Sequence, residues 1–279
     1  MQKDLFKENS NSASYDDTSD ISTYEAKEKI IRNFKDYISG QHPPENNTKH
    51  DGFAGHWLER RLGKDPDSDN TADFWGYECK NYTKSKTTWG DWSPNYYIFE
   101  DNYFDINRDQ FIKIFGKFNP KKERYSWSGE PVPSRYGDIT GFGQSLIIED
   151  NKDISIYYNY NEDKRDNKAS LVPEILMRKK ILLAKWHSLE KNNFSKKTSL
   201  EVKVNNKFNQ RGWFKCVVED NKYSKIVFGD PINIYEWISL VKKGEIFFDS
   251  GMYQGNNRHY SQWRSNNIFW DSLIKEEFF

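Results

Sequence analysis

Residues 52–80 constrain this chain more than any other segment, because they specify a helix, a turn and a strand in close succession. Apolar side chains recur at i, i+4 and i+5 from Phe53, which predicts a short amphipathic helix over residues 53–62. Residues 64–71 are rich in Asp, Ser, Asn and Pro, a composition typical of a turn. Residues 73–80 then have the pattern of a strand. The segment therefore predicts a helix and a strand joined by a turn, each carrying acidic residues.

The strand carries a chemical pattern, Asp73-x4-Glu78-x-Lys80. Because side chains alternate along a strand, Glu78 and Lys80 are expected on one face, with Cys79 on the other. Carboxylate oxygens suit Mg²⁺, which lowers the pKa of a bound water and offsets charge on a phosphate. A nearby lysine positions that water or stabilises a negatively charged transition state. The pattern is what metal-assisted phosphodiester hydrolysis needs, but a solvated edge strand also accounts for the bare triplet.

The residues around this pattern are Gly52-x-x-Gly55-x-x-Leu58-Glu59, followed by Asp73 and Glu78-x-Lys80. They resemble the catalytic region of the MutH mismatch-repair nickase and the MvaI/BcnI restriction endonucleases. In that family a glycine-flanked helix supplies the first Glu, and a hairpin supplies the Asp and the Glu-x-Lys. The spacing is similar to the MvaI branch, which has the shorter gap between Asp and Glu.

A second region is similar to the C-terminal DNA-reading segment of the MvaI branch. It comprises Trp213-Phe-Lys-Cys, a predicted helix over residues 231–242, the segment 243–255 and Trp263-Arg264. The chain departs from the family in two places. Arg258-His-Tyr-Ser-Gln-Trp-Arg264 replaces a His-Asp-His-Gly run, and Glu100-Asp101 stands where relatives tend to carry a lysine. The recognised sequence and an auxiliary lysine therefore cannot be carried over from the family.

The resemblance implies an α/β fold of the restriction-endonuclease-like (PD-(D/E)XK) kind, a mixed sheet flanked by helices, with two lobes that form a DNA cleft. It implies a type II restriction endonuclease that cuts double-stranded DNA at a short specific sequence with Mg²⁺, leaving 5′-phosphate ends. Asp73 and Glu78 would hold the metal, together with the carbonyl of Cys79. Lys80 would orient the attacking water, and Glu59 would support the metal site or Lys80. It also implies a monomer that nicks one strand and then the other, with a cognate DNA methyltransferase in the host.

Three ranges are expected along the chain: a polar arm over residues 1–22, a catalytic lobe over 23–139 and a DNA-recognition lobe over 140–279. Arg binds guanine bidentately and Asn or Gln binds adenine in the major groove, so the polar loop 251–264 is the candidate base reader. Basic residues beside the catalytic strand are candidates for phosphate contacts. An ordinary polar loop and a plain hairpin connection are the structural alternatives. The candidate DNA-binding residues are Lys84, Lys86, Tyr253, Gln254, Asn257, Arg258, His259 and Arg264.

Periodicity elsewhere predicts a mixture of helices and strands. The expected helices cover residues 23–39, 108–115, 173–191 and 230–243, and the expected strands cover residues 96–99, 144–149, 154–158, 200–204, 213–218, 226–228 and 245–248. The strand at 96–99 is expected beside the catalytic strand. Residues 117–141 are expected to lack regular structure and form either a solvated loop or a DNA arm that carries Lys121, Lys122, Arg124 and Arg135.

Composition narrows the function less than the motifs do. Lys and Arg number 42, as do Asp and Glu, which counts mildly against a nucleic-acid partner but is compatible with local basic patches. Aromatic residues make up 16% of the chain, which suits either an aromatic core or a sugar-binding surface. The two cysteines indicate neither disulfides nor a zinc site. No apolar run is long enough to span a membrane, so a cytoplasmic protein without a membrane partner is expected.

Two other functions remain open at this point. A MutH-like DNA repair nickase would share the chemistry but need a mismatch, a hemimethylated site or a protein activator. A non-catalytic glycan-binding module would explain the aromatic residues and the neutral charge.

Overall fold

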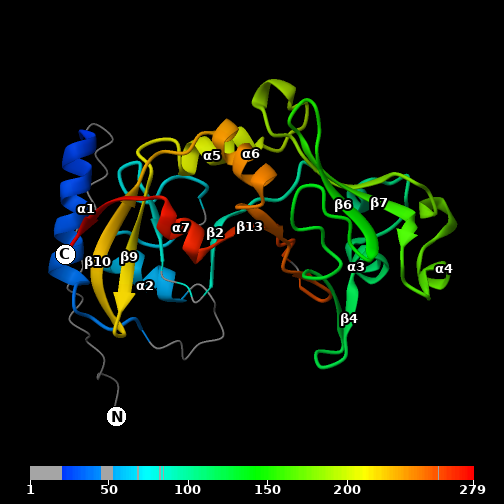
Figure 1. Cartoon of the computed structure of the whole chain (residues 1–279), viewed down its shortest axis with the longest axis horizontal. Coiled ribbons are helices and arrows are strands. Elements are labelled where there is room, and N and C mark those ends of the chain that lie inside the picture. The colour runs from blue at the N-terminus through cyan, green and yellow to red at the C-terminus, as the bar shows by residue number, and fades with distance from the viewer. Residues whose placement is uncertain (1–20, 45–52, 68, 82, 84, 257) are drawn as a thin grey trace, which may run out of the picture. The chain divides into compact units, whose positions relative to one another are not determined.

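The computed structural model describes residues 21–44, 53–67, 69–81, 83, 85–256 and 258–279 (Figure 1). The chain forms two compact units, each built from separate stretches of sequence. Unit 1 comprises Met1–Lys84, Asn206–Pro231 and Asp271–Phe279, and unit 2 comprises Ser85–Asn205 and Ile232–Trp270. The units do not follow the expected boundary between residues 139 and 140, because the chain leaves unit 1 after residue 84 and returns to it twice. The predicted arm at residues 1–22 lies, except for its last two residues, outside the described residues.

Unit 1 is a four-stranded mixed sheet with helices beside it (Figure 1). The strand order is β1 (Glu78–Lys80), β9 (Trp213–Glu219), β10 (Lys222–Gly229) and β14 (Ile274–Phe278). β1 runs parallel to β9, with Glu78 opposite Trp213 and Lys80 opposite Lys215, and the other strand pairs are antiparallel. Helices α1 (Thr23–Tyr37) and α2 (Phe53–Arg61) pack their apolar residues into one core with this sheet.

Helix α1 shows how the local sequence sets an element of this unit. Ser22 caps it, because its hydroxyl accepts the amide hydrogen bond of Glu25 at 3.2 Å while the Glu25 carboxylate accepts the Ser22 amide at 2.9 Å. This reciprocal pair is a capping box, which satisfies backbone donors that the helix leaves unpaired. Ile30 and Phe34, one turn apart, are buried against the sheet. The predicted helix is confirmed, and Ser22 is its N-cap.

The described part of unit 2 contains three small sheets. An antiparallel sheet has the order β3 (Tyr96–Tyr97), β8 (Ile181–Trp186), β7 (Ile154–Asp163) and β6 (Phe142–Ile148). A second sheet has the order β11 (Phe247–Asp249), β13 (Gln262–Asn266) and β2 (Lys86–Asp91). A third has the order β12 (Met252–Tyr253), β5 (Arg124–Trp127) and β4 (Lys117–Asn119). The α-helices from this part of the chain are α3 (Arg108–Phe115), α4 (Lys168–Leu171), α5 (Leu200–Lys207), α6 (Ile234–Lys243) and α7 (Asn267–Ser272), of which α5 and α7 end in unit 1. Three 3-10 turns lie at Ile98–Glu100, Glu174–Leu176 and Glu190–Asn192.

The core of unit 2 is built largely from aromatic rings. Trp263 lies edge-on to Trp186 and Trp237, with ring centroids 5.4 and 5.1 Å apart. Phe248 packs edge-on to Trp186 at 5.0 Å. The Trp186 indole N–H donates to the Trp92 carbonyl at 2.7 Å, so the burial of this ring leaves its donor satisfied. The sequence left open whether the aromatic residues form a core or a sugar-binding surface; the ones named here belong to the core.

The predicted helix over residues 173–191 is wrong. Residues Ile181–Trp186 form strand β8, which lies between β3 and β7 in its sheet, and only a short 3-10 turn precedes it. Ile181, Leu183, Ala184 and Trp186 are buried, so β8 is covered on both faces. A strand buried on both faces lacks the alternation of a half-buried one, and a short apolar run then fits either element.

Two further predictions are corrected. Residues 200–204 begin helix α5 instead of forming a strand, and the buried Leu200 and Val204 are spaced by one helical turn. Tyr96 and Tyr97 pair with β8 in unit 2, not with the catalytic strand. The place beside β1 is taken by β9, which comes from much later in the chain. The other predicted helices, at 108–115 and 230–243, and the predicted hairpin of 144–149 with 154–158 are confirmed.

Gly212, just before β9, allows the backbone there to lie close to both β1 and the end of β10. Its φ is +97°, and its carbonyl accepts the Glu78 amide hydrogen bond at 3.0 Å. A Cβ at this position would lie 2.2 Å from the Gly229 carbonyl oxygen. We expect Gly212→Ala to lower the free energy of unfolding by about 2–4 kcal/mol through backbone strain and overpacking, measured by urea denaturation.

The control is Gly141→Ala, since no heavy atom lies within 4 Å of the Cβ that it would add. That substitution should change the free energy of unfolding by less than about 1 kcal/mol. If Gly212→Ala were as stable as Gly141→Ala, the close contact between residue 212 and the Gly229 carbonyl would be contradicted.

Candidate active site

A tight turn explains the short gap between the predicted acids. The residues that flank Trp75-Gly76 exchange backbone hydrogen bonds of 2.9 and 2.8 Å. Trp75 and Gly76 have φ of 45° and 86°, the positive values that two-residue hairpin turns of type I′ require. The turn folds Asp73 back beside β1, where its Oδ2 accepts the Cys79 amide hydrogen bond at 2.9 Å. Local backbone geometry thus fixes one predicted metal ligand against the strand that carries the other.

Glu78 lies at the centre of a buried charge cluster. Its side chain belongs to β1 and the residue is only 2% exposed. Lys80 Nζ lies 2.8 Å from its Oε1, as the alternation of the strand predicts. Lys207, at the end of α5, donates to both oxygens at 2.9 and 3.0 Å. Burial alone would raise the pKa of Glu78, but the two ammonium groups outweigh burial and hold it below its usual range.

The other two acids respond to burial in the opposite way. Burial, with the charge of Glu78 as the next contribution, raises the pKa of Asp73 to about 6. Burial, with the charge of Asp73 next, raises the pKa of Glu59 on α2 to about 7. Because each acid is affected by the charge of another, the helix and the strand bring the predicted acids into one electrostatic cluster. Lys64 Nζ, 3.8 Å from Asp73 Oδ1, offsets part of this charge.

The donor set suits a hard divalent cation. Asp73 and Glu59 are half-buried carboxylates; the charge of Asp73 disfavours ionisation of Glu59 and that of Glu78 disfavours ionisation of Asp73, so a dication among them would relieve the repulsion. Carboxylate oxygens are the ligands that Mg²⁺ takes, usually alongside water and phosphate oxygens. In the described ranges, no three His, Cys, Asp or Glu side chains already converge as a full ligand set. The remaining ligands would therefore be backbone carbonyls, among which that of Cys79 stays a prediction, or water and phosphate.

Sequence reasoning missed Lys207. It lies 129 residues after Glu78, on a segment that was expected to follow a strand rather than end a helix. No local spacing links it to the acidic motif. The signal that would have found it is the parallel pairing of β9 with β1, because this pairing brings the end of α5 beside the catalytic strand.

The described candidates for DNA binding all lie in unit 2 and occupy three separate places, while Lys84 and Asn257 lie outside the described residues. Arg258 pairs with Asp91 at 2.9 Å, and the neighbouring His259 packs against Phe99 at 5.4 Å. Both residues line a cavity of about 440 Å³. The predicted loop 251–264 is therefore held by specific contacts at this point.

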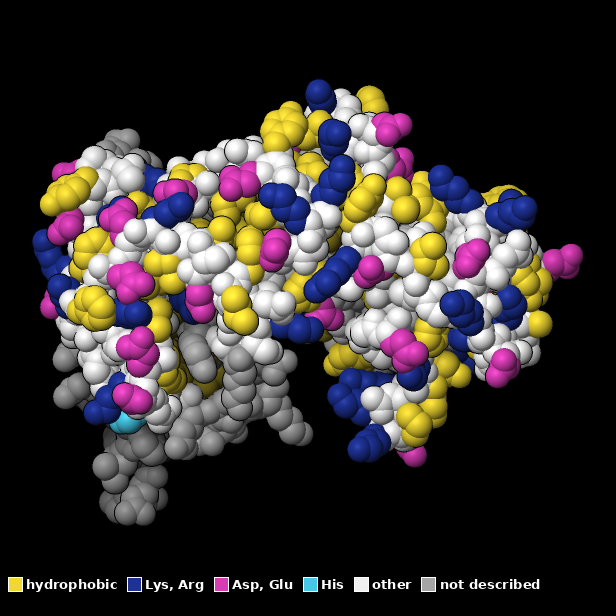
Figure 2. Space-filling view, viewed as in Figure 1, with side chains coloured by type: hydrophobic (Ala, Val, Ile, Leu, Met, Phe, Trp, Pro, Cys, Tyr) yellow, Lys and Arg dark blue, Asp and Glu magenta, His cyan; other side chains and the backbone are white. Residues whose placement is uncertain are grey.

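Tyr253 and Gln254 lie at a second place, against the hairpin of β4 and β5. The Arg124 guanidinium stacks 3.5 Å from the centre of the Tyr253 ring. The backbone amide of Gln254 donates to the backbone carbonyl of Tyr125 at 2.9 Å. Residues 117–127 were expected to lack regular structure, and this hairpin corrects that prediction. Lys and Arg side chains gather at its tip (Figure 2), and Phe118 is 45% exposed on it.

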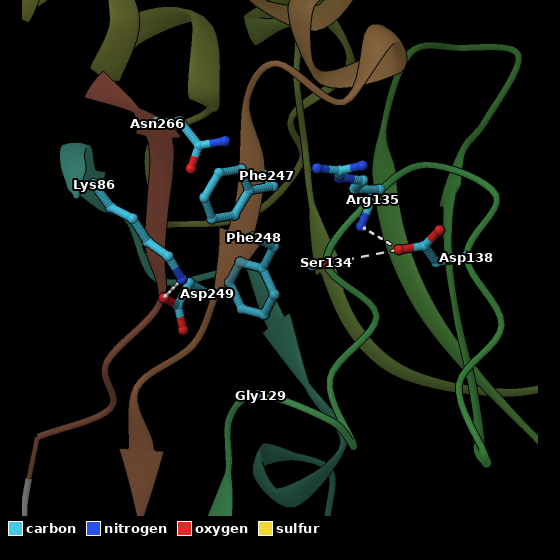
Figure 3. A pocket seen from close by; sticks show the side chains of 9 residues that line it. All are labelled: Lys86, Gly129, Ser134, Arg135, Asp138, Phe247, Phe248, Asp249 and Asn266. Atoms are coloured by element: carbon cyan, nitrogen blue, oxygen red, sulfur yellow. Dashed lines mark hydrogen bonds and ion pairs between the residues drawn. The ribbon is translucent and has the colours of Figure 1, made fainter. Parts of the chain in front are cut away.

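Lys86 and Arg264 share the third place. Each approaches Asp249 at 3.5 Å, from β2 and β13 respectively. Figure 3 shows Lys86 and Asp249 on one side of a cavity of about 490 Å³, the Phe247 ring between them and Arg135. Cationic, amide and aromatic side chains around one opening are groups that contact nucleic acids.

The fold resembles that of a solved nuclease. The chain is similar to the restriction endonuclease MvaI in complex with its cognate DNA substrate, with a TM-score of 0.55 and 15% sequence identity, over 92% of this chain and 98% of that one. This likeness, together with the mixed α/β architecture, shows the predicted restriction-endonuclease-like fold.

Sequence relatives then give the class and the family. The type II restriction enzyme ScrFI from Lactococcus lactis subsp. cremoris is 42% identical over 265 residues, which cover 90% of this chain and 97% of ScrFI. Fold and relatives together define a sequence-specific type II restriction endonuclease. The family model described as LlaMI restriction endonuclease matches residues 40–278, and the chain belongs to this family. The predicted resemblance to restriction endonucleases is confirmed, and the repair and glycan-binding alternatives gain no support.

The raised pKa of Glu59 predicts a dependence of stability on pH in the metal-free protein. Since the folded state raises this pKa from 4.5 to about 7, ionisation destabilises the fold: the loss begins above pH 4.5 and is complete above pH 7. We expect Glu59→Gln to raise the free energy of unfolding at pH 8 in EDTA by about 1–2 kcal/mol, after allowance for solvent screening.

The gain should shrink as the pH falls toward 4.5 and disappear below it, where Glu59 is protonated in both the folded and the unfolded state. Glu28→Gln on α1 is the control, because this glutamate is exposed and lies outside the cluster. A gain at pH 8 that persists unchanged at pH 4.5 would show that ionisation is not its cause.

Proposed function

We propose that the protein hydrolyses phosphodiester bonds of double-stranded DNA at a short specific sequence, with Mg²⁺, and leaves 5′-phosphate and 3′-hydroxyl ends. Membership of the family supports the reaction class. The observation that carries the assignment of the site is the packing of Lys80 against Glu78 at 2.8 Å, beside the anchored Asp73. Two carboxylates and a lysine held together at the start of one strand are the groups that this hydrolysis requires.

Each residue then has a defined role. Asp73 and Glu78 would hold the metal, with the Cys79 carbonyl as a further ligand. When bound, Mg²⁺ supplies Lewis acidity and offsets charge on the phosphate. Lys80 orients the attacking water and places positive charge near the phosphate as its phosphorus becomes pentacoordinate. Glu59, on α2, supports the metal site or Lys80.

Unit 2 supplies the DNA contacts. Lys86, Arg258 and Arg264 have the guanidinium and ammonium groups that bind phosphates and guanine edges. We expect a monomer that cuts one strand and then the other, in the cytoplasm of a host that protects its own DNA with a cognate methyltransferase. No helix in the described ranges is long and apolar enough to cross a bilayer.

The site assignment predicts that Asp73→Ala and Lys80→Ala abolish cleavage, lowering the single-turnover rate by at least about 1,000-fold. Binding to a cleavable DNA in Ca²⁺, measured by gel shift, should stay within about tenfold of wild type, because these residues act on the reacting phosphate. Phage DNA without host methylation is the substrate, and digestion with Mg²⁺ into discrete fragments tests the function itself. A cleavage rate near that of wild type in either variant would show that the replaced residue is not part of the active site.

The hairpin of β4 and β5 predicts a phosphate contact without sequence preference. We expect Lys121→Gln with Lys122→Gln to weaken binding equally for specific and unrelated duplexes and to reduce the salt dependence of log K by about 2. The matched control is Lys191→Gln with Lys196→Gln, which removes two exposed charges elsewhere in unit 2. Equal salt dependence of log K for the two double variants would show that the hairpin does not contact the DNA phosphates.

A further inference from the structure

Lys207 is not an incidental surface lysine. Its side chain is 16% exposed, and it makes the only two-oxygen contact to Glu78 that the described residues show. Lys80, by comparison, reaches one oxygen of the same carboxylate. A buried carboxylate and a buried ammonium each lose hydration, so this geometry persists only where each charge compensates the other.

The backbone around Lys207 is tied to the catalytic strand on both sides. The Ala72 amide donates to the Asn206 carbonyl at 2.9 Å, just before Asp73. The Arg211 amide donates to the Gly76 carbonyl at 3.0 Å, in the turn that leads to β1. Residues 206–211 therefore lie along the acidic motif, and the end of α5 is fixed toward Glu78 by more than its own side chain.

The two contacts of Lys207 occupy oxygen atoms that a metal ion would also use. A cation that binds Glu78 would share these oxygens with an ammonium, and the two positive charges would repel each other. Once displaced from one oxygen, a largely buried lysine needs another anion at short range. The phosphate that enters such a site is an anion of this kind, and a lysine contact to it stabilises the charge of the transition state.

We propose, on the basis of the proposed function, that Lys207 is a positioning residue that substitutes for the metal on Glu78 in the free protein and turns to the scissile phosphate when metal and DNA bind. It holds the carboxylate in place while the site lacks a dication. It then gives up one of its two contacts to the cation and supplies positive charge to the phosphate. Lys80 keeps its own contact to Glu78 throughout.

The test replaces Lys207 by Met, which keeps the length of the side chain and removes the charge. Lys64→Met is the matched control, because it removes an equal charge from the same cluster at a lysine that lies 3.8 Å from Asp73. Ca²⁺ affinity is measured by calorimetry without DNA, and the single-turnover rate is measured at saturating Mg²⁺. Urea denaturation in EDTA establishes that each variant is folded under assay conditions.

We expect Lys207→Met to bind Ca²⁺ more tightly than wild type, by a factor at least threefold larger than the gain for Lys64→Met. At saturating Mg²⁺ the cleavage rate should nevertheless fall by about 100-fold. Lys207→Arg, which keeps the charge, should recover the rate to within about tenfold and bind Ca²⁺ as weakly as wild type.

Two results would overturn the proposal: a Ca²⁺ gain no larger than that of the Lys64→Met control, or an unchanged rate at saturating Mg²⁺ in folded Lys207→Met. If Lys207→Met does not fold, the same comparison is made with Lys207→Gln. Failure of the wild-type protein to cut DNA would contradict the proposed function, whereas the Ca²⁺ measurement would still decide whether Lys207 competes with a cation for Glu78.

Discussion

The parallel pairing of β1 with β9 is the constraint on which the rest of the architecture depends. β1 is only three residues long, and in this sheet its neighbour is β9 alone. Parallel strands need a long crossover, and here the crossover from residue 85 to residue 205 forms the larger part of unit 2. The same pairing returns the chain to unit 1 beside the acidic motif. One strand pair therefore both completes the sheet of unit 1 and connects the two ends of the stretch that forms most of unit 2.

Burial of charge distinguishes this site from an ordinary hydrophobic core. Glu78 and Lys80 are almost fully buried on a strand whose neighbours are aromatic, including Phe208 beneath the Lys80 ammonium at 5.0 Å. Replacing such charges by apolar groups often stabilises a protein, so charge clusters of this kind are weak evidence for stability. Their presence in a folded core indicates that this part of the sheet is specified by chemistry, at a cost in stability.

How much the sequence could predict depended on the range of the interaction. Asp73, Glu78 and Lys80 are linked by strand alternation and by one two-residue turn, so their spacing carried the information. The helices at 23–37 and 53–61 were likewise readable, because each places its apolar residues on one face. The assignment of β8 failed because a strand covered on both faces has no alternation to detect.

Long-range pairing was not encoded in any local pattern. Lys207 contacts Glu78 because β9 pairs with β1. Likewise, β3 pairs with β8, which lies more than 80 residues later in the sequence, and not with β2, which directly precedes it. The resemblance to MvaI-type enzymes reached the residues that the family motif contains, and Lys207 lies outside that motif. Sequence reasoning therefore found the acids and the lysine that lie together at β1, but not the lysine that holds Glu78 through both oxygens.

The balance of 42 basic and 42 acidic residues also becomes intelligible once the charges are located. Acidic groups concentrate around Glu59, Asp73 and Glu78 in unit 1, while basic side chains gather at the hairpin tip in unit 2. A polyanion responds to the local potential rather than to the sum over the chain. The acidic centre would repel a phosphate until cations offset it, and Lys80, Lys207 and a bound dication all act in that direction. A neutral composition is therefore compatible with a DNA-cutting enzyme, provided that its positive charge is placed where the backbone of the duplex enters.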